Sequence, residues 1–200
     1  DVVLNWESPI PVATALRYDN GTNNDGAGFA SAADFGVYIR FETADLQMYR
    51  GMYLNSIEFF PKYVDCEYSI RAYQGGSYDG TTFNPGTMVV DQAINSTEIT
   101  VNDWNNVNLT SSIMIDVDQE LWIGYRANTQ GGRPAGYDAG PAINGKSNVM
   151  FYNDAWTTLS QLAPSYNYNW NLAGHISINQ GSIATSRGLN YFKIYKDGIE

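Results

Sequence analysis

Residues 35–41 read FGVYIRF, and this stretch decides the fold class of the chain. Its odd-numbered positions hold Phe, Val, Ile and Phe, whereas its even-numbered positions hold Gly, Tyr and Arg. Successive side chains of a β-strand point to opposite faces, so apolar residues at every second position indicate a strand with one buried face. The stretch therefore predicts a strand that packs its odd-numbered side chains into a core.

The same two-residue period recurs along the chain. It predicts further strands at residues 2–6, 55–60, 66–73, 87–92, 105–109, 121–127, 149–152 and 170–178. Clusters of Gly, Asn, Asp and Ser separate these runs and are typical of turns. Helical signals are confined to residues 44–50, with Thr43 as the cap, and to a turn at residues 158–162. Many short strands and very little helix predict an all-β, antiparallel β-sandwich that is jelly-roll-like.

The composition excludes several classes of protein. The chain has 200 residues, 44% of them hydrophobic and 16% charged, and its formal net charge is −10. The hydrophobic fraction is too high for a disordered chain. Phosphate contacts dominate nucleic-acid binding, so nucleic acid is not an expected partner of so acidic a chain. No apolar run approaches the roughly 20 residues of a transmembrane helix.

Cys66 is the single cysteine of the sequence, which excludes an intrachain disulfide and a thiolate zinc cluster. It lies in an alternating run, which predicts a buried strand residue rather than a reactive thiol. The sequence opens at Asp1 without Met and without a signal peptide. We interpret this beginning as that of a processed protein or of a fragment.

The two ends of the chain differ from its middle. Residues 2–9 read VVLNWESP and resemble the strand, Trp and Pro of a fibronectin type III-like domain. Residues 191–200 read YFKIYKDGIE and resemble the tyrosine-bearing strand and Asp-Gly turn of such a domain. This resemblance implies a sandwich module at residues 10–182, inserted into a host domain that contains residues 1–9 and 183–200. The alternative is that both ends are edge strands of one sandwich.

Eight segments of the middle carry a second resemblance. They are YDNGTNNDG (18–26), FGVYIRF (35–41), ADLQMY (44–49), IEFFP (57–61), SIRAYQG (69–75), QELWIGY (119–125), GRPAGYDAG (132–140) and YNWNL (168–172). In this order they resemble the β-sandwich modules of gingipain-like adhesins and peptidases, which are surface and secreted proteins of Gram-negative gut and oral bacteria.

This resemblance implies a fold and a role. The fold is a jelly-roll-like, galactose-binding-like sandwich, and the role is that of a non-catalytic adhesion module that binds glycans. The location it implies is secreted or at the cell surface, associated with the outer membrane. Glycans, extracellular-matrix proteins of a host and neighbouring domains of the same chain are the implied partners.

Residues 19–26 supply hard oxygen ligands at close spacing. Calcium takes six to eight such ligands, and the candidates are Asp19, Asn23 and Asp25, which Asp138 of another loop could join. Ala30 stands where an EF-hand loop has Glu, and the Asp-rich calcium signature of cleaved-adhesin modules is not recognisable. Asn, Asp and Gly also form plain turns, so a structural loop is the favoured interpretation and no cofactor is required.

Aromatic residues in or beside loops are candidates for carbohydrate contact. A sugar can stack its C–H face on a rigid ring while nearby polar groups bind its hydroxyls. The candidate residues are Tyr137, Asp138, Arg133, Trp156, Tyr166 and Tyr168. The alternative is that these rings belong to the core and that the module is a structural spacer.

A glycoside hydrolase is a further alternative. Asp116, Asp118 and Glu120 alternate and would share one face of a strand, as two close carboxylates of a retaining glycosidase must. The apolar residues on either side of them have opposite parity, which favours a hairpin turn instead. His175 is the sole histidine, and no G-x-S-x-G motif accompanies it, so we interpret it as an ordinary strand residue. We therefore expect no enzymatic activity.

Overall fold

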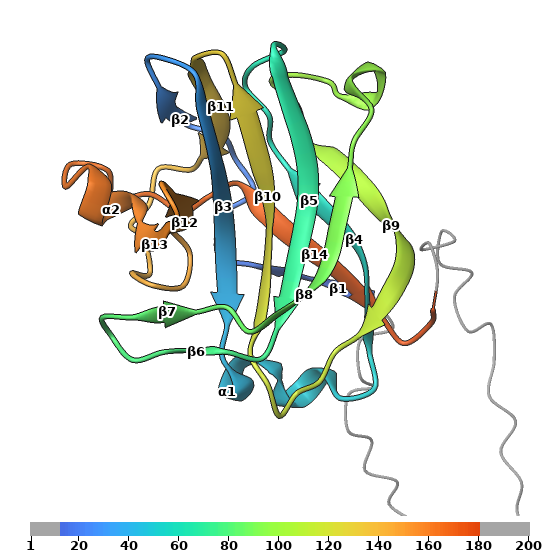
Figure 1. The fold of residues 1–200 in the computed structure, drawn as a ribbon. Coiled ribbons are helices and arrows are strands. Elements are labelled where there is room, and N and C mark those ends of the chain that lie inside the picture. The colour runs from blue at the N-terminus through green and yellow to red at the C-terminus, as the bar shows by residue number, and fades with distance from the viewer. Residues whose placement is uncertain (1–12, 181–200) are drawn as a thin grey trace, which may run out of the picture.

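The computed structural model describes residues 13–180 and shows two antiparallel sheets packed face to face (Figure 1). The four-stranded sheet contains, in spatial order, β1 (Ala13–Arg17), β14 (Leu172–Ser177), β4 (Tyr53–Phe59) and β9 (Asn105–Met114). The six-stranded sheet contains β13 (Ala155–Thr158), β12 (Val149–Tyr152), β3 (Ala33–Phe41), β10 (Leu121–Thr129), β5 (Cys66–Gln74) and β8 (Thr87–Ala93). The predicted all-β sandwich is confirmed.

Two small ribbons and four short helical pieces complete the described fold. The ribbons pair β2 (Asp25–Phe29) with β11 (Gly132–Tyr137) and β6 (Ser77–Tyr78) with β7 (Phe83–Asn84). The helical pieces are α1 (Thr43–Leu46), η1 (Gln47–Tyr49), η2 (Ser96–Glu98) and α2 (Leu159–Leu162). Within residues 13–180 no helix is long and apolar enough to cross a membrane.

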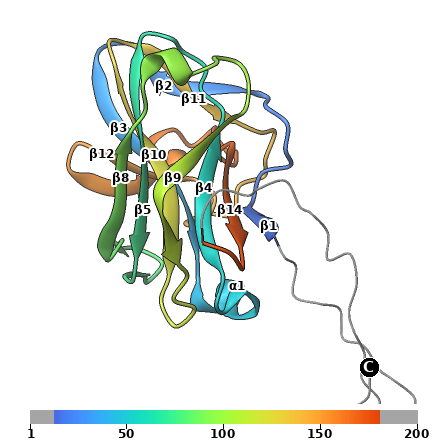
Figure 2. The same cartoon turned by 90° about the vertical axis from the view of Figure 1, so that its right-hand side faces the viewer.

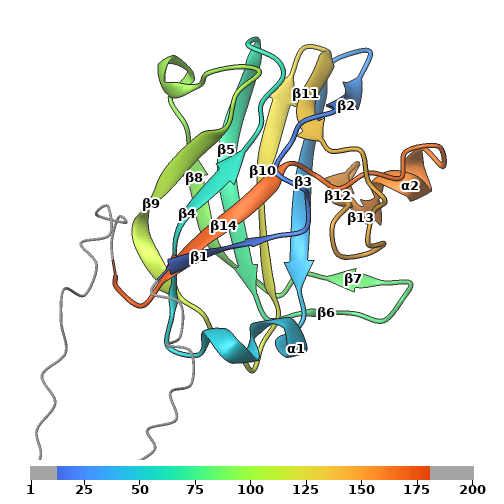
Figure 3. The same ribbon diagram turned by 180° about the vertical axis from the view of Figure 1, so that it is seen from behind.

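The core lies between the two sheets. Figure 2 shows the sheets edge-on, and Figure 3 shows them from the side of the four-stranded sheet. Val37 and Ile39 of β3 are fully buried in it together with Ile57 of β4, as the alternating pattern predicts. Trp170, just before β14, is also fully buried, and its indole N–H donates to the Val149 carbonyl at 2.9 Å. The odd-numbered residues of the FGVYIRF stretch therefore form the predicted buried face.

The even-numbered face of β3 is buried as well at one end of the strand. Tyr38 and Trp122 have no exposed surface and form a second apolar cluster with Tyr73 and Phe83. Phe83 comes from the β6–β7 hairpin, and its ring meets that of Trp122 edge-on at 5.9 Å between centroids. The hairpin thus covers part of a sheet face that would otherwise lie in solvent.

The sequence pattern does not predict six of the described strands, which are β1, β2, β6, β7, β11 and β13. The β2–β11 ribbon shows no two-residue apolar pattern, because both of its strands are rich in glycine. Strand β2 reads DGAGF and β11 reads GRPAGY. A Cβ added to Gly26 would lie 2.7 Å from the Arg133 carbonyl oxygen, closer than real Cβ contacts. The glycines therefore permit a close approach of two backbones, and they remove the side chains that would show a two-residue period.

The two predicted helical segments are present, with one difference at a cap. Helix α1 begins at Thr43, but its N-cap is Glu42, whose backbone N–H donates to the Asp45 carboxylate at 2.9 Å. Helix α2 follows Thr158, whose hydroxyl accepts a hydrogen bond from the Gln161 backbone N–H at 3.2 Å. Thr43 is therefore the first residue of its helix rather than the cap.

Candidate functional site

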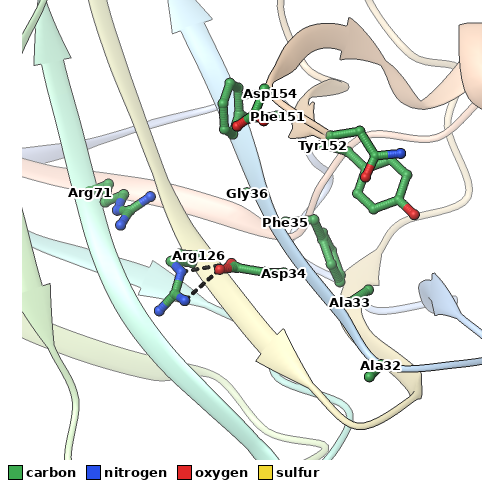
Figure 4. A pocket seen from close by; sticks show the side chains of 11 residues that line it. Ala32, Ala33, Asp34, Phe35, Gly36, Arg71, Arg126, Phe151, Tyr152 and Asp154 are labelled. Carbon is green, nitrogen blue, oxygen red and sulfur yellow. Dashed lines mark hydrogen bonds and ion pairs between the residues drawn. The ribbon is translucent and has the colours of Figure 1, made fainter.

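A groove of about 470 Å³ lies on the outer face of the six-stranded sheet, and we call it the outer groove (Figure 4). Small-ligand sites commonly measure roughly 300–1,000 Å³, so its size suits such a ligand. The lining residues that bear on ligand binding are Asp34, Gly36, Arg71, Arg126, Phe151 and Asp154. They come from β3, β5, β10, β12 and the β12–β13 turn, so a rigid sheet positions most of them.

Strand register places four residues of this region in one row. Trp156 of β13 pairs with Phe151 of β12, Phe151 pairs with Gly36 of β3, and Gly36 pairs with Arg126 of β10. Paired residues point to the same face of a sheet. Aromatic rings therefore stand on one side of Gly36 and a guanidinium stands on the other, and the Tyr38 side chain lies over Gly36 itself.

The absence of a side chain at Gly36 is required by the Tyr38 ring, which occupies the space over the glycine. A Cβ at Gly36 would lie 2.5 Å from Cε2 and 2.6 Å from the hydroxyl oxygen of Tyr38. That hydroxyl is buried and makes no hydrogen bond of good geometry among the described residues, although Tyr73 and Arg71 lie close enough to affect its pKa. Burial raises the pKa of Tyr38, so the phenol stays neutral.

Two arginines line the outer groove, and each is held by a carboxylate. Arg126 donates from Nε to Oδ1 of Asp34 at 2.7 Å and from Nη2 to Oδ2 at 2.5 Å. Arg71 donates from Nε and Nη2 to the two oxygens of Asp91 at 3.1 and 3.2 Å. Bidentate pairs of this kind fix the plane of each guanidinium and neutralise its charge. The hydrogen-bonded Asp34 also raises the pKa of Arg126.

The β12–β13 turn contributes a further carboxylate. Asn153 and Asp154 have φ values of 50° and 58°, the left-handed conformation of a two-residue hairpin turn. Asp154 is exposed and lines the groove (Figure 4). Within residues 13–180 it forms no ion pair. Its oxygens are therefore accessible to a ligand.

Trp156, a predicted carbohydrate contact, stands behind Phe151 rather than in the groove itself. Its ring lies 5.2 Å from the Phe151 ring and 4.8 Å from the Tyr38 ring, measured between centroids. It also meets Trp122 edge-on at 5.4 Å. Trp156 therefore packs against the Phe151 ring, which lines the groove, and holds that ring in position.

Three other predicted contacts, Tyr137, Tyr166 and Tyr168, come together at β11 and the loop before β14. Tyr137 and Tyr168 are stacked with 4.4 Å between centroids and 2° between planes, and Tyr166 meets both edge-on. Tyr137 is only 5% exposed. Tyr168 covers one face of the ring and Tyr166 meets it edge-on, so Tyr137 packs within the tyrosine cluster.

Asp138 is buried, with only 1% of its surface exposed. Its carboxylate accepts backbone N–H bonds from Asn20, Gly140 and Asn169 at 3.2, 2.6 and 3.0 Å. The Asn169 side-chain amide donates to both of its oxygens. These bonds join three loops, and they leave the carboxylate inaccessible to a ligand.

Arg133 is exposed and lies beside a separate, smaller cavity of about 190 Å³. Apolar residues such as Phe29, Met150 and Leu159 line most of that cavity, and Tyr166 stands at it too. Arg133 Nη1 lies 3.4 Å from the Asp25 carboxylate. The predicted carbohydrate residues thus fall into separate groups, of which only Trp156 adjoins the outer groove.

The predicted calcium ligands are engaged with cations and amides. The Asp19 carboxylate is buried and pairs with Arg17 at 2.6 Å. Asp25 lies near both Arg133 and Lys62, and the Asn23 side-chain oxygen accepts a bond from Lys62 at 3.3 Å. No cluster of three or more His, Cys, Asp or Glu suited to a metal occurs among the described residues. The carboxylates of this loop therefore already have cationic partners in the described fold.

The acidic triplet lies at the β9–β10 turn, as the favoured interpretation predicts. Asp116 Oδ1 accepts the backbone N–H of Asp118 at 3.0 Å, which is a turn contact. The Asp118 carboxylate is exposed and pairs with Arg50 at 3.2 Å. Glu120 instead holds the buried Arg40. The three carboxylates therefore have separate partners and do not share one strand face.

His175 lies on β14 with its Nε2 atom 3.3 Å from the Glu58 carboxylate. Arg17 Nη1 lies 3.8 Å from the same carboxylate. The contact with His175 is the main reason that the pKa of Glu58 lies below its ordinary value, and partial burial opposes it. The histidine thus lies beside a carboxylate that also faces Arg17 on the four-stranded sheet.

No family model matches the sequence, and no curated protein sequence matches it. Two solved structures of the clostridial protein Cwp84 share the fold. One is the cysteine protease Cwp84 after propeptide cleavage, with a TM-score of 0.56 and 12% identity, and covers 86% of this chain and 41% of that chain. The other contains the cysteine protease and lectin-like domains of Cwp84, a surface-layer-associated protein of Clostridium difficile, with a TM-score of 0.51 and 12% identity.

The matched part of both structures is the lectin-like domain. The second match covers 86% of this chain and 37% of that chain, so this chain spans well under half the length of each structure. The likeness establishes a β-sandwich fold. It does not bear out the narrower resemblance to gingipain-like modules. The fibronectin-like ends lie outside the described residues, and the boundaries at residues 10 and 182 stay predictions.

Proposed function

We propose that this chain is a non-catalytic module of a secreted or cell-surface protein and that it binds a carbohydrate in the outer groove. The observation that carries the proposal is the row formed by Phe151, Gly36 and Arg126. A sugar offers an apolar C–H face and a set of hydroxyls. An aromatic ring beside oriented polar groups in one groove complements both features.

The fold comparison supports this proposal. The structures that share the fold belong to a surface-layer-associated protein, and the matching part is described as lectin-like. A site on a sheet is also better suited to recognition than a site on a loop, because the strand register fixes the positions of its side chains. The proposed binding function is therefore supported by two separate observations, the fold and the groove.

A glycan array probed with the complete 200-residue chain tests the proposal. The chain is expected to bind a subset of the glycans, and an Arg126→Gln variant is expected to lose at least about tenfold in affinity, or about 1.4 kcal/mol. Arg50→Gln serves as the matched control, because Arg50 forms an exposed ion pair with Asp118 at a distant turn. The control is expected to bind like the unchanged chain.

Two outcomes would contradict the proposal. If the unchanged chain binds no glycan on the array, the result would favour a structural spacer that positions neighbouring domains. Binding that both arginine variants retain would place the carbohydrate site elsewhere on the molecule.

A further inference from the structure

We infer that the outer groove selects a neutral sugar, whose adjacent hydroxyls are bound by the Asp34–Arg126 pair, and that it rejects acidic sugars. This inference rests on the proposed carbohydrate-binding function and adds the chemical class of the ligand.

The geometry of the Asp34–Arg126 pair provides a donor beside an acceptor. Arg126 uses Nε and one hydrogen of Nη2 to bind Asp34. A guanidinium has five N–H donors, so Nη1 keeps both of its hydrogens for a ligand. Each Asp34 oxygen also retains acceptor capacity, and the Asp34 side chain is 52% exposed. One sugar hydroxyl can therefore donate to Asp34 while its neighbour accepts from Arg126.

The charges of the groove disfavour a ligand that carries a carboxylate. Asp34 and Asp91 occupy the Nε–Nη2 edges of Arg126 and Arg71 and neutralise both guanidinium charges. Asp154 lines the groove without an ion pair among residues 13–180. An acidic sugar that accepted from Nη1 of Arg126 would bring its carboxylate into a groove that Asp34 and Asp154 line, and repulsion between like charges makes this unfavourable. The net charge of −10 adds repulsion at longer range.

The aromatic side of the row completes the recognition of a neutral ring. Phe151 stands opposite Arg126 across Gly36, and Trp156 packs behind it. A pyranose in the outer groove would place one face against Phe151 and its hydroxyl edge against the Asp34–Arg126 pair. An apolar ring contact of this kind has no preference for charge, so the polar pair decides between neutral and acidic sugars.

Matched pairs of sugars test the inference with the complete chain. The probes are glucose, galactose and mannose conjugates and the corresponding uronic acids, measured by biolayer interferometry at low and high salt. The unchanged chain is expected to bind at least one hexose at least about tenfold more tightly than its uronic acid, with little dependence on salt. Asp34→Asn releases Arg126 and is expected to narrow or reverse that preference.

Asp118→Asn is the control, since it removes an exposed carboxylate from an arginine outside the groove. Thermal unfolding of each variant verifies that the fold is intact. A uronic acid that binds more tightly than its hexose, or a preference that Asp34→Asn leaves unchanged, overturns this inference while the proposed function stands. Absence of binding to every probe and to the glycan array overturns both.

Discussion

The outer groove and the loop cluster around Asp138 use the same residue types for different purposes. Each contains an aspartate beside aromatic rings. In the groove the Asp34 side chain is 52% exposed and shares its oxygens with one arginine. In the loop cluster Asp138 is 1% exposed and its oxygens are occupied by backbone and amide N–H groups.

The difference shows what separates a binding carboxylate from a structural one. Both lie beside turns and aromatic residues, so composition alone does not distinguish them. What distinguishes them is the source of their hydrogen bonds. A carboxylate that joins three loops by accepting backbone N–H groups stabilises the fold, whereas one held at a sheet surface by an arginine keeps acceptor capacity for a ligand.

The largest expected effect is on the tyrosine stack. Tyr137→Ala should lower the free energy of unfolding by about 3–5 kcal/mol, because it removes a buried ring that packs against Tyr168 and Tyr166. Tyr137→Phe keeps the ring and should stay within about 1 kcal/mol of the unchanged chain. Chemical unfolding monitored by tryptophan fluorescence measures both. A Tyr137→Ala variant that remains stable and loses carbohydrate binding would place the binding site in the loop cluster rather than in the outer groove.

The next effect separates the two aspartates directly. Asp138→Asn should cost about 2–3 kcal/mol, because one acceptor oxygen becomes a donor facing buried N–H groups. Asp34→Asn should cost less than about 1 kcal/mol, since exposed ion pairs contribute little. Urea midpoints for the two variants measure the difference. Equal losses would show that exposure does not distinguish these carboxylates.

A smaller effect is expected on acidification. A hydrogen bond from Lys146 holds the pKa of Glu42 below its ordinary value, with partial burial opposing it and Arg40 adding to it. Because the folded pKa is lower than the unfolded value of about 4.3, the carboxylate stabilises the fold above that pH. The contribution is lost as pH falls through the folded pKa.

Lys146→Gln removes one of the two cations that pair with Glu42, leaves Arg40 in place, and also removes a partner of Asp45. It should flatten this part of the pH–stability profile by less than about 1 kcal/mol, because Glu42 is partly exposed. Thermal unfolding between neutral and acidic pH measures the profile. An unchanged slope below pH of about 5 in the variant would show that Lys146 does not cause the shift.

The smallest expected effect is that of calcium. Arg17, Lys62 and Arg133 already pair with the carboxylates of Asp19 and Asp25. Calcium at millimolar concentration is therefore expected to leave the unfolding temperature unchanged. A clear stabilisation that an Asp25→Ala variant loses would restore the calcium site, and with it a ligand-binding role for this loop.

The sequence predicts the sheets well because their signal is local. Alternation at residues 35–41 and 121–127 is visible in any short window, and both segments form central strands. The β2–β11 ribbon is not predictable in this way, because its glycines serve a contact between segments about 100 residues apart, with Gly26 paired to Gly136. Its formation depends on tertiary packing rather than on a two-residue period.

The outer groove was not predicted because its residues are distant in the sequence. Asp34, Arg126 and Phe151 become neighbours only through strand register. The one local signal is that Gly36 stands among the even-numbered positions of the FGVYIRF stretch, where a side chain is absent. Loop position led to Tyr137 and Asp138 instead, since burial of a loop residue is not visible in the sequence.

Backbone amide NMR shifts of the complete chain on titration with the tightest-binding hexose test the central claim most directly. The account predicts shift changes at Gly36, Arg126, Phe151 and Asp154, which line the outer groove. The amides of Tyr137 and Asp138 should remain unchanged. Changes concentrated at those two loop residues, with none at Gly36, would contradict the account.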